Sequence, residues 1–158
     1  MMKSMNFEFL KGVNDILYRI ALAAEKNFPD DPNTTLVKLR MFGEASAKHI
    51  GKLLDIELPP TQIELVRELA KVSWVDDSII NVFHMLRKVG NQAVHEYHND
   101  LDDAEMALRL AFRLSVWYYR LVKKDVDFAA PLFALPQSGQ EAEYEVEVTE
   151  LKQALLIN

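Results

Sequence analysis

The chain has 158 residues, of which 49% are apolar, so it is long and hydrophobic enough to fold as one domain with a buried core. It contains no cysteine, which excludes disulfides and thiolate metal sites, and no apolar run approaches the ~18 residues of a membrane span, so we expect a cytoplasmic protein without a membrane partner. Most of the net charge of −6 lies at the C-terminal end, where residues 141–158 hold five glutamates and one lysine. The rest of the chain is nearly neutral, so it lacks the basic field that is typical of proteins that bind nucleic acid unspecifically.

Apolar side chains recur every three or four residues along most of the chain, which predicts helices and no strand. Prolines and capping residues divide this pattern into five segments. The first three predicted helices run from about Asn6 to Phe28, from a cap at Asn33 or Thr34 to about Leu54, and from Thr61 to about Val72. The fourth begins at Asp76 or Asp77 and ends before Tyr97, and the fifth runs from Asp102 or Asp103 to about Lys124. The pattern predicts an all-α antiparallel bundle of four to five helices, with the fifth, apolar on most sides, at its centre.

The C-terminal part of the chain has a different character. Residues 128–140 contain two prolines and a glycine and are predicted to be a linker, draped over the bundle by its apolar side chains. Residues 141–158 carry Tyr144, Val148, Leu151 and Leu155 at helical spacing, which is typical of an acidic helix that starts a stalk or coiled coil. The predicted organisation is a bundle domain at 1–127, a linker at 128–140 and a stalk at 141–158.

A polar stripe on the fourth predicted helix is the main candidate site. Arg87, Asn91 and His95 recur at intervals of four, so a helix places them on one face among apolar neighbours. They could form an internal polar network with Arg40 and Glu44 of the second helix, in which Arg87 pairs with Glu44 across thin glycine-bearing surfaces. They could instead bind a nucleotide, RNA or a protein partner, or form a ribonuclease site. We expect neither a cofactor nor a metal in this chain.

Two segments resemble a known family. The run from Asp31 to Glu44, DPNTTLVKLRMFGE, and the run from Arg87 to His95, RKVGNQAVH, look like the helical domain at the N-terminus of type I restriction enzyme R subunits, as does the closing segment at 114–118. The resemblance covers about residues 6–124, and the family is grouped with the HEPN superfamily of helical bundles. It implies a defence protein in which a linker and stalk lead into a nuclease and an ATP-driven DNA translocase.

Neither of those two activities has its motif in this sequence, which lacks a Walker-type phosphate loop and a carboxylate-rich nuclease signature. The resemblance therefore implies a non-catalytic interaction or regulatory domain of an R subunit. Its implied partners are other restriction-modification subunits or domains, nucleic acid, or a second copy in a homodimer.

The alternative is a metal-independent ribonuclease acting as a dimer. Catalytic HEPN proteins have an arginine, a polar residue, three further residues and a histidine. Asn91 matches the polar residue of this pattern and His95 matches the histidine. Gly90 stands where the arginine is expected, and Arg87 lies one helical turn earlier. His95 would be the general base of such a site, with Asn91 and Arg87 as further catalytic candidates.

Other motifs carry weaker hypotheses. His95 and His98 are three apart, but they lack a further ligand for a metal site. The aromatic run at 117–119 could stack bases, although aromatic residues on a buried helix more often belong to the core. Arg120 and the lysines at 123–124 form a short basic end that suits a helix C-terminus.

Overall fold

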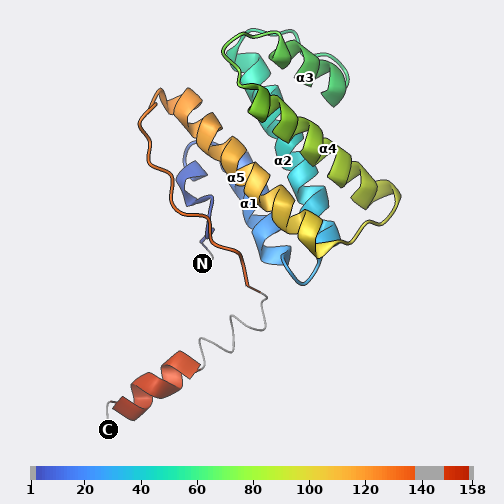
Figure 1. Ribbon diagram of the computed structural model, residues 1–158. Helices are drawn as coiled ribbons and strands as arrows, with labels where there is room; N and C mark the ends of the chain where they lie inside the picture. Colours follow the sequence, from blue (N-terminus) through green and yellow to red (C-terminus); the bar gives the residue numbers. More distant parts are fainter. Residues whose placement is uncertain (1–2, 138–147, 157–158) are drawn as a thin grey trace.

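The computed structural model describes residues 3–137 and 148–156, and all regular structure within these ranges is helical (Figure 1). A 3-10 turn precedes five α-helices that form a bundle, as the sequence predicted. In chain order the elements are η1 (Glu8–Leu10), α1 (Asp15–Asn27), α2 (Pro32–Leu53), α3 (Gln62–Ala70), α4 (Asp77–His95) and α5 (Leu101–Lys123).

Helix α2 lies at the centre of the bundle, because it is the helix in contact with each of α1, α3, α4 and α5. Its buried side chains include Leu36, Leu39 and Phe42, and the core continues through apolar residues of the other four helices. The sequence prediction of a central α5 was wrong in this respect. One face of α5 is buried, but Arg109 and Arg113 keep the opposite face in solvent.

Each of the helices α1 to α5 is preceded by a capping residue, whose side chain accepts a hydrogen bond from a free backbone N–H of the first turn. Asp76 caps α4, as predicted, whereas Thr61, predicted as the first residue of its helix, is the cap of α3. Helix α2 begins earlier than predicted, with Asp31 as its cap and Pro32 in its first turn, and α5 begins at Asp100. Proline suits the first turn of a helix because its missing N–H would have no partner there.

The predicted first helix from Asn6 to Phe28 is wrong at its N-terminal end. Gly12 has a φ of +80°, which a helix does not allow, and Asn14 caps α1 by accepting from the N–H of Leu17. The residues before Gly12 instead fold back on α1, where the buried carboxylate of Glu25 accepts hydrogen bonds from the side chain of Ser4 and from the backbone and side chain of Asn6. Apolar residues of this segment remain in the core, which is why the periodicity looked continuous.

The described part of the predicted linker packs against the bundle. Phe128 lies 4.2 Å from Tyr119 between ring centroids, and Phe133 lies 5.7 Å from Phe112. Asn6 holds the backbone of Ala134 with two hydrogen bonds of 2.8 and 2.7 Å. Residues 128–134 are therefore anchored at both ends along α5 and the N-terminal segment, while the side chain of Leu132 remains exposed.

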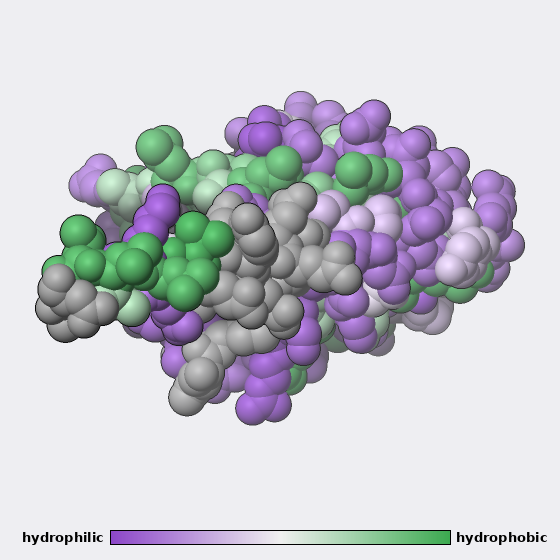
Figure 2. All heavy atoms as spheres, turned by 90° about the horizontal axis from the view of Figure 1, so that it is seen from below, coloured by the Kyte–Doolittle hydropathy of each residue, from purple (hydrophilic) through white to green (hydrophobic). Residues whose placement is uncertain are grey.

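Residues 148–156 form a further helix with exposed leucines. Figure 2 shows apolar side chains of this helix at the surface. Tyr144, the first position of the predicted stalk stripe, lies outside the described residues, so the predicted coiled coil stays a prediction. Among the described helices, none is long and apolar enough to cross a membrane.

Candidate functional site

Three of the five predicted site residues lie where α2 crosses α4, and Arg40 is the one that joins the two helices. Its Nη1 donates to Oδ1 of Asn91 at 3.2 Å, and its Nε lies 3.6 Å from Oε1 of Glu44. Both helices have a glycine at the crossing, and the close approach is at Gly90. A Cβ built on Gly90 would lie 2.3 Å from the Cβ of Arg40, and one on Gly43 would lie 3.5 Å from Leu86. Arg40, Glu44 and Asn91 thus form a small polar network, which holds three of the five residues of the predicted one.

Arg87 does not join this network. Within the part of the chain that the structure describes, it makes no ion pair with Glu44, and its Nε is buried without a hydrogen-bond partner. It lines a hollow of about 550 Å³ between α3 and α4, together with His84, Lys88 and Arg67. Burial lowers the pKa of His84, and the nearby charges of Arg87, Lys88 and Arg67 lower it further.

His95 is separate from both groups. It is the last residue of α4, its side chain is exposed, and no hydrogen bond or ion pair joins it to Arg87, Asn91 or Arg40 among residues 3–137. The three members of the predicted stripe therefore meet three different surroundings: a basic hollow, an interhelical hydrogen bond and open solvent.

This arrangement bears directly on ribonuclease chemistry. Cleaving RNA without a metal requires a general base and a cation at the same phosphate. An arginine in place of Gly90 would bring its Cβ into the side chain of Arg40, so the position that the HEPN pattern reserves for arginine is sterically closed in this fold. Arg87 and His95 stand two turns apart on α4, about 12 Å along the axis.

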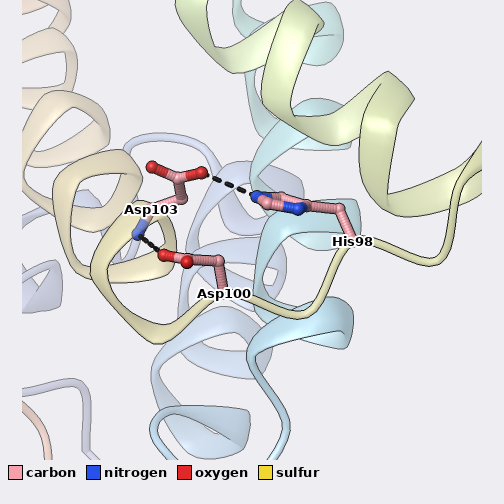
Figure 3. Close-up of side chains that lie close together, drawn as sticks. All are labelled: His98, Asp100 and Asp103. Carbon is pink, nitrogen blue, oxygen red and sulfur yellow. Dashed lines mark hydrogen bonds and ion pairs between the residues drawn. The ribbon is translucent and has the colours of Figure 1, made fainter.

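A cluster of His98, Asp100 and Asp103 at the start of α5 brings three potential metal ligands within 4.8 Å of one another (Figure 3). Local structure accounts for each of them. Asp100 caps α5 by accepting from the N–H of Asp103 at 2.8 Å, and the carboxylate of Asp103 lies 2.6 Å from Nε2 of His98. The sequence analysis paired His98 with His95 and missed these two carboxylates, although the D-x-x-D spacing is typical of a helix cap.

Comparison with known proteins gives one strong match. Over 155 residues, 98% of this chain, the sequence is 64% identical to the type I restriction enzyme EcoKI endonuclease subunit of Escherichia coli (strain K12). The matched part is the N-terminal 13% of that protein. The chain is similar to the N-terminal region of a restriction endonuclease subunit. No protein-family profile matches the chain, and no solved structure matches it.

The match agrees with the resemblance carried by the Asp31–Glu44 and Arg87–His95 segments. The matched region includes both helices of the α2–α4 crossing, because it covers 155 of the 158 residues of this chain. The chain spans about an eighth of the length of the restriction subunit, so the nuclease activity in that protein's name is not assigned to this part by the match.

Proposed function

We propose that this chain is a non-catalytic interaction domain at the N-terminus of a type I restriction enzyme R subunit. The observation that carries the proposal is the 64% identity to the N-terminal region of an endonuclease subunit, in a segment without a nuclease or translocase motif. In this proposal the domain has a HEPN-like fold and acts in the cytoplasm as part of a defence system.

The α2–α4 crossing supports a structural role for the polar stripe. Arg40 bonds to Asn91 across the helix interface and lies over Gly90, so these residues fix how the two helices pack. A catalytic role would require the guanidinium and imidazole groups to converge, whereas His95 faces solvent at the end of α4.

Exposed apolar residues at the C-terminal helix support an interaction role. Leu151, Leu155 and Leu156 have exposed fractions of 65%, 76% and 85%. Exposed apolar side chains that gather on one surface are typical of an interaction site. The proposed partners are other subunits or domains of the restriction enzyme, with a second copy of the chain as the alternative.

The proposal is tested by mixing the purified chain with the other subunits of the restriction enzyme and measuring the mass of the products by light scattering. We expect a complex with at least one of them, and we expect a Leu151→Lys/Leu155→Lys variant to weaken it if the C-terminal helix is the contact. An Ile16→Lys variant, which changes an exposed apolar residue of α1, is the matched control. The absence of any complex would contradict the proposed function.

A further inference from the structure

The solvent face of α5 carries a stripe of cations with a tryptophan among them. Arg109, Arg113, Trp117 and Arg120 follow one another at steps of four, four and three residues, so they share one face of the helix. Lys124, directly after the helix, continues this α5 stripe. From Arg109 to Arg120 the stripe extends about 17 Å along the axis.

Two adjoining hollows lie along the α5 stripe. The larger, about 600 Å³, is lined by Arg109, Arg113 and the segment around Phe133. The other, about 460 Å³, is lined by Trp74 and Lys124. Trp117 and Arg120 line both hollows, so the two adjoin at these side chains on the outer face of α5. We refer to them together as the groove, and the 128–134 segment borders the larger of the two.

An aromatic pair stands in this groove. The rings of Trp74 and Trp117 are stacked, with centroids 6.4 Å apart and an interplanar angle of 23°. Trp74 lies in the connection between α3 and α4 and is 53% exposed, so it contributes little to the core. An exposed, flat tryptophan face is a surface on which a nucleic-acid base can stack.

The charges in the groove are only partly compensated. Arg109 pairs with Glu105 at 3.2 Å, and Arg120 donates two hydrogen bonds to the carbonyl of Phe128. Within the described ranges, Arg113 and Lys124 have no ion pair.

One carboxylate, that of Asp76, also lines the groove, where it caps α4 by accepting from the N–H of Ser78. The groove is therefore locally positive, although the whole chain has a net charge of −6.

We propose that this groove binds single-stranded nucleic acid, with the cations of the α5 stripe on its phosphates and a base stacked on the Trp74–Trp117 pair. A positively charged groove with aromatic platforms is the arrangement that single strands require, because their bases are free to stack on a side chain. An acidic peptide would satisfy the cations but would leave the tryptophan pair without a role. The inference deepens the proposed function by naming one partner of the non-catalytic domain.

The test is fluorescence anisotropy of short labelled single-stranded DNA and RNA titrated with the full chain at low salt. We expect saturable binding of a single strand that weakens as salt rises, and tryptophan quenching on binding. Arg113→Gln should weaken binding and reduce the salt dependence, Trp74→Ala should weaken it roughly tenfold or more, and Trp74→Phe should retain most of the affinity. Lys48→Gln, an exposed charge change on α2, is the matched control and should leave binding unchanged.

Two results would overturn the inference: no saturable binding of either single strand, or binding that Arg113→Gln and Trp74→Ala leave unchanged. A different result would assign the groove to an acidic peptide instead: polyglutamate of equal charge displaces the single strand, and Trp74→Ala leaves the affinity for the strand unchanged. The affinity difference between DNA and RNA identifies which strand is bound. Association with the restriction subunits is measured separately by light scattering. A chain that binds no single strand but still forms that complex would therefore contradict this inference and leave the proposed function standing.

Discussion

The side chain of Arg40 lies directly over the α-carbon of Gly90, so that a methyl group on that carbon would lie 2.3 Å from the Cβ of Arg40. This relationship sets the separation of α2 and α4 and leaves Arg40 to bond with Asn91. It also explains why Gly90 is tolerated within a helix, where glycine costs up to ~1 kcal/mol relative to alanine.

Replacing Gly90 by alanine should destabilise the fold. The clash involves the Cβ of Arg40 and not the flexible end of its side chain, so the helices must separate to relieve it. We expect a loss of about 1–3 kcal/mol in the free energy of unfolding from overpacking, which outweighs the gain in helix propensity. Chemical unfolding followed by circular dichroism measures the loss.

Gly43→Ala is the matched control for this prediction, because its new methyl group would meet Leu86 at an ordinary 3.5 Å and should leave stability unchanged or raised. The double variant Arg40→Gly/Gly90→Ala should recover part of the loss, because glycine at position 40 removes every atom of the clash. If Gly90→Ala and Gly43→Ala changed the free energy of unfolding equally, the close approach of the two helices would not be the reason for glycine at position 90.

Stability should carry a pH dependence that Glu25 causes. Burial raises the pKa of this carboxyl above its ordinary range, although hydrogen bonds from Ser4 and Asn6 act in the opposite direction. The folded state therefore holds the proton more tightly than the unfolded state, so the contribution of Glu25 is fully present below the ordinary carboxyl pKa and is lost as the pH rises through the raised value. Urea unfolding of the wild type at a series of pH values, from below the ordinary carboxyl pKa to above the raised one, should show this fall in the free energy of unfolding.

Glu25→Gln removes the charge and keeps an amide oxygen for the donors of Asn6. The difference in unfolding free energy between wild type and variant should therefore shift in favour of the variant as the pH rises. A hydrogen bond from Tyr18 lowers the pKa of Glu8, so Glu8 makes stability rise with pH. This contribution is the same in wild type and variant and cancels in the difference. A difference that is flat with pH would contradict the assignment.

Asn33 should be important for stability although it is not the cap that the sequence suggested. Its Nδ2 donates to the carbonyls of Ala93 and His98, both at 2.8 Å, and so ties the start of α2 to the end of α4. Asn33→Ala removes both bonds and should cost about 1–3 kcal/mol in thermal or urea unfolding. Asn81→Ala, at an exposed position on α4, should cost little, and equal losses from the two variants would argue against the tie.

The cluster of His98, Asp100 and Asp103 should act as a cap and not as a metal centre. Asp100→Ala should lower stability by about 0.5–2 kcal/mol through loss of the bond to the N–H of Asp103, and EDTA should leave the melting temperature of the wild type unchanged. A saturable rise in melting temperature with added Zn²⁺ that Asp100→Ala abolishes would show that the cluster holds a metal.

The sequence predicted the helices well where apolar spacing and caps agree, as for α4, which begins directly after the predicted capping residue Asp76. It did not separate η1 from α1, because the apolar residues on both sides of Gly12 reach the same core, whereas the backbone leaves the helical conformation at Lys11, Gly12 and Asn14. For α2, the sequence pattern favoured Asn33 or Thr34 as the cap, but Asp31 takes that place, because Pro32 fits the first turn that follows it.

The site was predictable only in part. Helical spacing placed Arg40 and Glu44 on one face of α2, and the structure joins both to the α4 crossing. Whether Arg87 reaches Glu44 depends on the rotation of α4 about its axis, which local spacing does not fix. Likewise, the spacing of the α5 stripe is visible in the sequence, whereas its pairing with Trp74 depends on how the loop before α4 folds against α5.

The central claim is that this chain is an interaction domain without nuclease activity of its own. It is tested most directly by incubating the purified, mass-checked chain with labelled single-stranded RNA in EDTA, beside its His95→Ala variant. We predict that the RNA stays intact with both proteins. Cleavage by the wild type that His95→Ala abolishes would contradict the account and identify the chain as a metal-independent ribonuclease.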